Sequence, residues 1–246
     1  MDIERLAIPE IAILKPARFG DARGFFSETY NKQHLAEAGF HLDFVQDNHA
    51  WSAQKGTVRG LHFQTPPFAQ DKLVRVVRGA ILDVVVDVRR GSPTYGRHVA
   101  AEISAGAWNQ ILVPVGFAHG LCTLMPDTEV IYKVTNYYSP AHDKGVLWND
   151  PALGIDWPVA AGEAILSDKD LRLPPLAELP ESACSVGWGT LGKGKTGDEG
   201  RPIQVGGIVC RKGLWMHPPT NGGTSVVYHL RGKFLRYPPA PLNMAA

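Results

Sequence analysis

The stretch AILDVVVDVR, residues 80–89, decides the fold class of this chain. β-branched residues dominate it, which favours a strand over a helix, and its side chains alternate with the period of a strand. Asp83 and Asp87 fall on one face of the predicted strand. The other face is wholly apolar, with Ala80, Leu82, Val84, Val86 and Val88.

The same strand character recurs on the C-terminal side of this stretch, in HVAAEIS (98–104), NQILVPVG (109–116) and TEVIYKVTNYY (128–138). Gly or Pro interrupts the chain roughly every 8 to 12 residues, a spacing typical of a sandwich or barrel. We therefore expect an all-β protein in which the first 180 residues form an antiparallel jelly roll. One short helix is predicted over residues 31–40, with Asn31 as its N-cap and Gly39 as its end.

Composition is that of an ordinary soluble globular protein, with 44% hydrophobic and 20% charged residues. A formal net charge of +1 gives no electrostatic reason to expect nucleic acid or a membrane as partner. The N-terminal stretch MDIERLAIPE carries charges where a signal peptide needs apolar residues, so we expect the cytoplasm. Cys122, Cys184 and Cys210 are odd in number and widely spaced, which predicts neither a disulfide framework nor a zinc site.

Charge and glycine content divide the chain near residue 180. Residues 183–246 hold eight Lys/Arg, two Asp/Glu and 12 of the 26 glycines. The Pro-rich segment LRLPPLAELPES (171–182) precedes this change and is interpreted as a linker. We expect a domain over residues 1–182 and a small Gly-rich β appendage over residues 183–246.

Polar residues occur in the predicted strands at positions that could face a barrel interior, where an unsatisfied polar group is costly. Each of them has a structural explanation of its own, such as a solvated strand end or a satisfied core histidine. The set comprises Arg23, Glu28, Gln46, Asn48, Arg59, His62, Lys72, Asp83, His119, Tyr132, Lys133 and Asp170.

Taken together, these residue types favour proton transfer next to a carbonyl group. A histidine can take a proton near neutral pH, a carboxylate can orient it, a tyrosine can return a proton, and cations can hold phosphates or an enolate. In a regular strand Arg59 and His62 would point to opposite faces, so their convergence needs a bulge or twist at Gly60. A metal-binding barrel is the competing interpretation, but neither His62 nor His119 has a second histidine two residues away.

Six stretches, in order along residues 1–181, resemble the dTDP-4-dehydrorhamnose 3,5-epimerases, the cofactor-free cupins of nucleotide-sugar biosynthesis. They are DARGFFSETY, FVQDNHAWSAQKGTVRGLHFQ, QDKLVRVVRGAILDVVVDVRRGSPTYG, ILVPVGFAHGL, VIYKVTNYYSPAHDKGVLWNDPALGIDWP and ILSDKD. The resemblance implies a cupin-type jelly roll that acts as an isomerase and forms a homodimer. It also implies that no cofactor is needed, in agreement with the lack of a GxGxxG motif.

The resemblance further implies a role for individual residues. His62 matches the proton acceptor, Asp170 its carboxylate partner and Tyr132 the proton donor, while Lys72 stands where enolate charge develops. Tyr138 matches an aromatic residue that stacks on thymine, and Asp83 a carboxylate that we assign to His119. The remaining matches are to residues that contact the nucleotide sugar: Arg23, Glu28, Gln46, Asn48, Arg59, Lys72, His119, Asp143 and Lys169.

The implied reaction is epimerisation of dTDP-4-dehydro-6-deoxy-glucose at C3 and C5, giving dTDP-4-dehydro-rhamnose. The C4 ketone acidifies both hydrogens, so one acid–base pair can act at each carbon in turn. Three alternatives stay open: epimerisation of C3 or C5 alone in another dTDP-ketosugar, a metal-dependent cupin, and a non-catalytic sugar-binding protein.

The segment 183–246 is similar to the start of the NPCBM-type carbohydrate-binding modules. The matching stretches are Gly187-Trp-Gly, Gly206-Gly207, KGLWMHP (212–218) and VVYHLRGKF (226–234). The chain ends where such a module would continue, which leaves about half of a β-sandwich. We expect a truncated β-rich appendage and assign no site residues to it.

Overall fold

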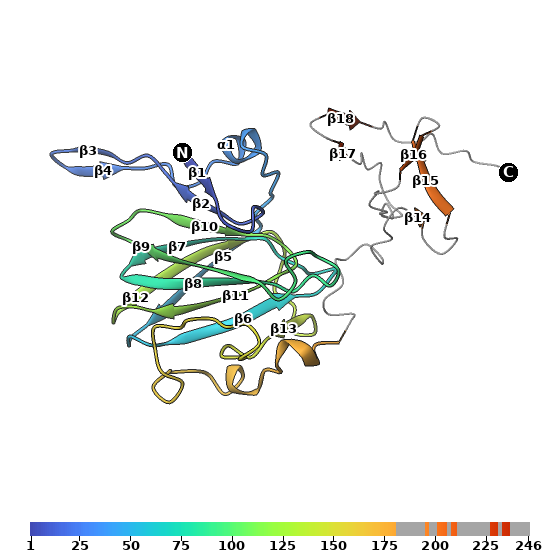
Figure 1. Ribbon diagram of the computed structural model, residues 1–246. Coiled ribbons are helices and arrows are strands. Elements are labelled where there is room, and N and C mark those ends of the chain that lie inside the picture. Colours follow the sequence, from blue (N-terminus) through green and yellow to red (C-terminus); the bar gives the residue numbers. More distant parts are fainter. Residues whose placement is uncertain (181–194, 197–200, 206–207, 211–226, 231–232, 237–246) are drawn as a thin grey trace. The chain divides into compact units, whose positions relative to one another are not determined.

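The computed structural model describes residues 1–180, 195–196, 201–205, 208–210, 227–230 and 233–236 (Figure 1). The chain divides into two units, Met1–Gly187 and Trp188–Ala246. The predicted boundary after residue 182 falls outside the described residues and stays a prediction.

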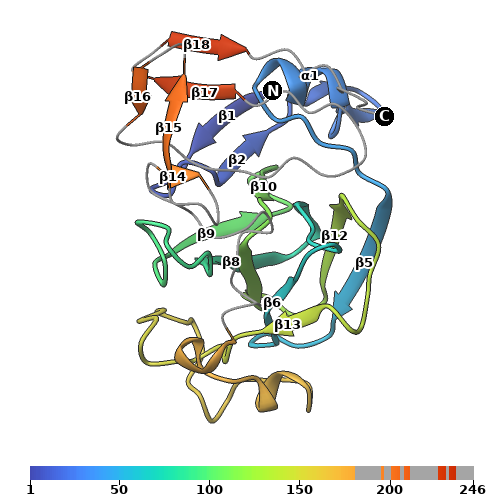
Figure 2. The ribbon, with the colours of Figure 1, turned by 90° about the vertical axis from the view of Figure 1, so that its right-hand side faces the viewer.

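Two antiparallel sheets face each other in the first unit (Figures 1 and 2). The larger has the strand order β1-β2-β10-β7-β12-β5, with bounds Asp2–Arg5, Ala12–Lys15, Gln110–Val113, Lys72–Arg78, Thr128–Val134 and Gln46–Ser52. The smaller has the order β13-β6-β11-β8-β9, with bounds Asp143–Gly145, Val58–Gln64, Phe117–Thr123, Ala80–Asp87 and His98–Ser104. These sheets confirm the all-β jelly roll that the alternating segments predict.

Strand β8, the core of the stretch 80–89, is buried on both faces. Ile81 and Val85 pack between the sheets, and Val84 and Val86 pack beneath the segment 146–179. Asp83 therefore faces the space between the sheets with no exposed surface. This arrangement agrees with the predicted alternation and places one carboxylate inside the sandwich.

Asp87, at the end of the same strand, has a structural environment. Its carboxylate is fully buried and accepts hydrogen bonds from the side chains of Arg89, Ser92 and Thr94. Burial raises the pKa of Asp87, but these donors outweigh it and hold the pKa below the usual value. Asp87 thus organises the loop that follows β8 and takes no part in the cavity described below.

The prediction that residues 171–182 form a linker is wrong for the described part of that segment. Two 3₁₀ turns, η1 (Asp170–Arg172) and η2 (Leu176–Glu178), carry it along the domain. Leu176 and Leu179 are 7% and 4% exposed in the outer core, and Arg90 Nη2 donates to the Leu179 carbonyl at 3.0 Å. Apolar burial therefore overrides the linker character that the prolines suggest.

Helix α1 spans Lys32–Glu37 and has the predicted ends. The Asn31 side chain accepts hydrogen bonds from the amides of Gln33 and His34, which satisfies two free donors of the first turn. Gly39, at a φ of +89°, follows the last turn. Leu35 packs on the outer face of the six-stranded sheet. In the part of the chain that the structure describes, no helix has the length and hydropathy needed to cross a membrane.

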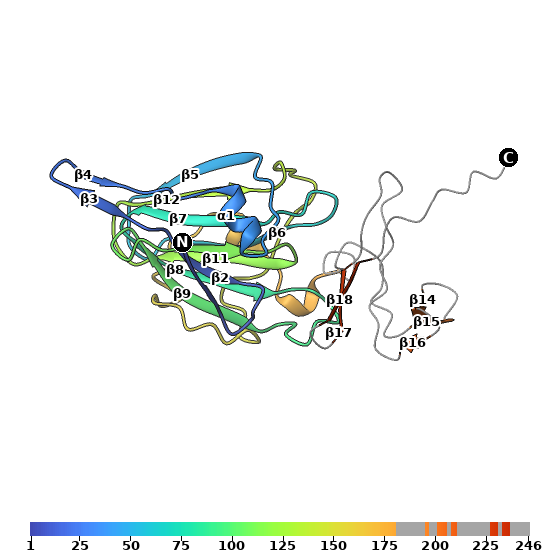
Figure 3. The same cartoon turned by 90° about the horizontal axis from the view of Figure 1, so that it is seen from above.

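The hairpin of β3 (Phe19–Asp21) and β4 (Gly24–Phe26) projects from the sandwich (Figures 1 and 3). Phe19, Phe25 and Phe26 on it are 65%, 55% and 70% exposed. Three exposed aromatic side chains on one short element are unusual for a surface that only meets solvent.

In the second unit, β14 (Lys195–Thr196), β15 (Arg201–Val205) and β16 (Ile208–Cys210) form one antiparallel set. A separate hairpin joins β17 (Val227–Leu230) and β18 (Lys233–Arg236). Strands are thus present in the predicted β appendage. Gly187-Trp-Gly, Gly206-Gly207 and KGLWMHP lie outside the described residues, and carbohydrate binding by this unit stays a prediction.

Candidate active site

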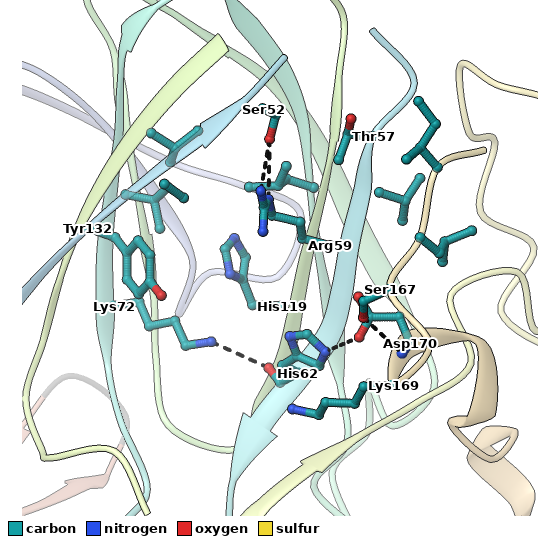
Figure 4. A pocket seen from close by; sticks show the side chains of 17 residues that line it. Ser52, Thr57, Arg59, His62, Lys72, His119, Tyr132, Ser167, Lys169 and Asp170 are labelled. Atoms are coloured by element: carbon teal, nitrogen blue, oxygen red, sulfur yellow. Dashed lines mark hydrogen bonds and ion pairs between the residues drawn. The ribbon is translucent and has the colours of Figure 1, made fainter. Parts of the chain in front are cut away.

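A cavity of about 500 Å³ lies between the two sheets (Figure 4). One wall comes from β5, β7 and β12 of the larger sheet, and the other from β6 and β11 of the smaller sheet. The segment 165–170 closes one side. Its polar lining brings together much of the predicted set: Ser52, Thr57, Arg59, His62, Lys72, His119, Tyr132, Ser167, Lys169 and Asp170.

His62 and Asp170 form a close pair in this cavity. His62 Nε2 lies 2.5 Å from Asp170 Oδ1 (Figure 4). The Asp170 side chain is only 5% exposed, and its burial raises its pKa. Hydrogen bonds from His62, Ser167 and the Gly60 amide outweigh the burial and hold the pKa of Asp170 below its usual value. The carboxylate therefore stays ionised near neutral pH and fixes the orientation of the imidazole.

A second histidine–carboxylate pair lies deeper. His119 Nε2 is 2.8 Å from Asp83 Oδ2, and the two side chains are 10% and 0% exposed. The other oxygen of Asp83 is buried with no hydrogen-bond partner among the described residues. Asp83 thus contacts His119, the residue to which the sequence analysis assigns it.

Lys72 and Tyr132 extend from the opposite wall, on β7 and β12. Lys72 Nζ donates to the His62 carbonyl at 3.4 Å. Burial lowers the pKa of Lys72 to about 8, an effect that the charges of Asp83 and Asp143 oppose. Burial also raises the pKa of Tyr132, so its phenol stays protonated at neutral pH. The cavity thus holds a cation next to a neutral hydroxyl group.

Arg59 lies on the same wall as His62, as the predicted irregularity at Gly60 requires. The register between β6 and β11 shifts at this point. The Arg59 guanidinium is held by Ser52 Oγ, 3.2 Å from both Nε and Nη2, and by the Trp51 carbonyl, 3.0 Å from Nη2. A planar cation held in this way is suited to bidentate binding of a phosphate.

A smaller cavity of about 320 Å³ adjoins the first and shares His62, Lys72, Tyr132 and Lys169 with it. It holds the predicted residues Gln46, Asn48, Tyr138 and Asp143. Gln46 Nε2 donates to Asn48 Oδ1 at 2.8 Å. Asp143 pairs with Lys169 and accepts a hydrogen bond from the Tyr138 hydroxyl at 3.1 Å.

Three residues of the predicted polar set lie elsewhere. Arg23 pairs with Asp21 on the projecting hairpin, and Glu28 lies 3.0 Å from His34 Nδ1. Neither lines the two cavities described above. Lys133 binds Asp47 on the outer face of the larger sheet, because alternation along β12 turns it away from the side that Tyr132 faces.

Ser52, Thr57 and Ser167 line the cavity but were not predicted. For Ser52 the signal was available, since it continues the alternate positions of Gln46 and Asn48 along β5. Ser167 Oγ accepts a hydrogen bond from the Asp170 amide at 3.2 Å. The spacing of a serine three residues before an acidic residue is a known local motif. Thr57 precedes β6, where strand periodicity gives no indication of its direction.

These features define a class: a jelly-roll enzyme whose internal cavity brings together a histidine–carboxylate pair, a tyrosine and a lysine, residue types suited to acid–base chemistry. Among the described residues, no group of three or more His, Cys, Asp or Glu side chains has the arrangement of a metal site. The chain itself belongs to the dTDP-4-dehydrorhamnose 3,5-epimerase family, whose model matches residues 5–178.

Individual relatives agree with this assignment. The dTDP-4-dehydrorhamnose 3,5-epimerase of Sinorhizobium fredii is 52% identical over 182 residues, which are 74% of this chain and 93% of that protein. The Bacillus anthracis enzyme of the same name, solved with TDP and PPi bound, is 52% identical with a TM-score of 0.69, covering 71% of this chain and 98% of that one. A Legionella pneumophila dTDP-6-deoxy-D-glucose-3,5-epimerase, in complex with dTDP-4-keto-L-rhamnose, is 39% identical with a TM-score of 0.72, covering 75% and 97%.

Proposed function

We propose that this chain epimerises dTDP-4-dehydro-6-deoxy-glucose at C3 and C5 to give dTDP-4-dehydro-rhamnose. The observation that carries the proposal is the placement of the His62–Asp170 pair and of Tyr132 on opposite walls of one cavity. A sugar ring between the walls presents one face to the base and the other to the acid. Membership of the epimerase family supports the same reaction.

In the proposed reaction, the nitrogen of His62 that does not face Asp170 removes the proton from the carbon next to the ketone. The C–H electron pair forms a double bond from that carbon to C4. The π electrons of the C4 ketone move to its oxygen, where negative charge develops. The Lys72 ammonium stabilises this enolate charge. The Tyr132 hydroxyl then donates its proton to the opposite face, which inverts the carbon. Proton exchange with solvent restores His62 and Tyr132 before the second carbon reacts.

The nucleotide is proposed to bind in the adjoining cavity. Arg59 in the larger cavity and Lys169, which lines both cavities, carry charges suited to the diphosphate. Tyr138 is 57% exposed and can stack on the base, while Gln46 and Asn48 offer amides to its polar edge. The remaining assigned contacts, His119 and Asp143, lie in the two cavities that the substrate would bridge.

A homodimer is the assembly that fits the projecting hairpin. Phe19, Phe25 and Phe26 would be covered by a second copy. Arg23 and Glu28 line neither of the two cavities described above, so their predicted contact with substrate would be made in the site of a partner. Sedimentation of wild type and Phe26→Asp tests this. We expect a monomeric variant, whereas the exposed control Met125→Asp should remain dimeric.

The reaction is tested by NMR of dTDP-4-dehydro-6-deoxy-glucose with the protein in deuterated water. Deuterium at both C3 and C5 is expected, and incorporation at a single carbon would establish a monoepimerase instead. His62→Asn should abolish incorporation. Activity that is lost on chelation and restored by a stoichiometric metal would favour the metal-dependent cupin.

Binding of free glycans without any turnover would favour the non-catalytic alternative. The cytoplasm, where we expect the dTDP-sugar to be available, is the proposed location, and cell fractionation tests it.

A further inference from the structure

Strand β6 departs from regular alternation at the point where the site requires it. His62 is opposite His119 and Arg59 is opposite Leu121 in the register with β11. Two residues of β6, Gly60 and Leu61, therefore face a single residue of β11, Gly120. This is the pattern of a β-bulge, and it places Arg59 and His62 on the same side of the strand.

The two backbones approach too closely at this bulge for any side chain. A Cβ atom on Gly60 would lie 2.6 Å from the Gly120 Cα and 2.8 Å from the His119 carbonyl oxygen. A Cβ atom on Gly120 would lie 2.9 Å from the Arg59 carbonyl oxygen and 2.9 Å from Leu61 Cδ2. A side chain at either position would therefore clash with the backbone of the other strand, so both positions require glycine.

Gly60 also has a φ of +125°, a conformation that other residues rarely adopt. Its strand contacts the turn η1 that begins at Asp170. The Gly60 amide is one of the groups that hold the pKa of the Asp170 carboxylate down. One glycine therefore links the strand that carries His62 to the turn that carries its partner.

We propose that Gly60 and Gly120 are a positioning pair for the active site. Their contact sets the bulge that puts Arg59 and His62 on one wall of the cavity and keeps the Gly60 amide near Asp170. Neither glycine touches the substrate. The inference rests on the proposed function for its kinetic consequence, but the geometry can be measured without substrate.

The first test is Gly120→Ala, with Gly106→Ala as its control. Neither glycine has a positive φ, and a Cβ atom on Gly106 meets nothing within 4 Å. A displacement of about 1 Å at a catalytic group can cost about 10²-fold in rate, so we expect that loss of kcat per folded molecule in Gly120→Ala. The ¹³C-detected titration of Asp170 should move to higher pH. Gly106→Ala should match wild type in both measurements.

Wild-type kcat per folded molecule and an unmoved Asp170 titration in Gly120→Ala would overturn the proposal. If that variant does not fold, ¹⁵N-glycine labelling of the unchanged chain replaces it. The Gly60 amide should then shift with the Asp170 titration, and Asp170→Asn should abolish this shift. If the chemical shift of the Gly60 amide does not change as Asp170 titrates, the proposal is also overturned. The amide measurement needs no substrate. If the wild-type protein incorporates no deuterium into the sugar, that result therefore refutes the proposed function and leaves the proposal about the two glycines standing.

Discussion

Replacement of Lys72 by methionine should remove the alkaline limb of the rate profile. Burial lowers the Lys72 pKa from 10.5 to about 8, so in wild type the cation that faces the enolate is lost above that pH. The rate should fall to half near pH 8 and then about tenfold for each further pH unit. Lys72→Met should lose about 10²–10³-fold at pH 7, the magnitude typical of one electrostatic contact to an oxyanion.

The same substitution should stabilise the fold at neutral pH. A lysine whose folded pKa lies below its unfolded value costs stability while it is charged, and this cost disappears as pH rises from about 8 to 10.5. The difference between the two values corresponds to at most about 3 kcal/mol. Lys72 is half-buried and the cavity admits solvent, so we expect about 1–3 kcal/mol.

Two measurements check this reasoning. Deuterium incorporation at saturating substrate from pH 6 to 10 gives the rate profile, and urea unfolding at pH 7 gives the free energy of unfolding. Lys133→Met is the control, because Lys133 pairs with Asp47 on the outer face and should give neither effect. An alkaline limb that survives in Lys72→Met, or a variant less stable than wild type at pH 7, would refute the assignment.

Other perturbations have equally direct outcomes. Tyr132→Phe should keep deuterium exchange at the carbon next to the ketone but slow product formation by about 10²-fold, as followed by NMR. Asp170→Asn should lower kcat by up to about 10⁴-fold. Because the folded pKa of Asp170 is depressed, its stabilising effect is present above about pH 4 and is lost as pH falls, so acid unfolding of Asp170→Asn should show a flatter pH dependence. Asn31→Ala should cost about 1 kcal/mol in urea unfolding through loss of the helix cap.

The strands and the helix could be predicted from the sequence because the patterns that specify them extend over only a few residues. The alternation along 80–89 and the cap at Asn31 each act within a few residues. The segment 171–180 was misjudged because its prolines suggest a linker, whereas its burial depends on Leu176 and Leu179 meeting a core formed far earlier in the chain. The residues that neighbour Leu176 and Leu179 in the sequence do not indicate that these two side chains pack against that core.

The site was predictable in its residue types and less so in its geometry. Period-two alternation separates Arg59 from His62, and only the contact between Gly60 and Gly120 reunites them. Tyr132 and Lys133 are adjacent polar residues of the predicted set, but their side chains face opposite sides of β12. Arg23 and Glu28 fall on or near a hairpin and line neither of the two described cavities, so the proposed role of these two residues depends on an assembly that sequence patterns do not describe.

One buried oxygen of Asp83 has no hydrogen-bond partner among the described residues, and this has a consequence for the lifetime of the protein in a cell. This oxygen and the lowered pKa of Lys72 show that the lining of the cavity reduces the stability of the fold. A ligand that satisfies these groups binds only the folded chain, and at 100 times its dissociation constant it adds about 2.7 kcal/mol to the free energy of unfolding. Heat tolerance and resistance to proteolysis should therefore follow the supply of nucleotide sugar, so that the enzyme persists when its pathway is running and is cleared faster when substrate is scarce.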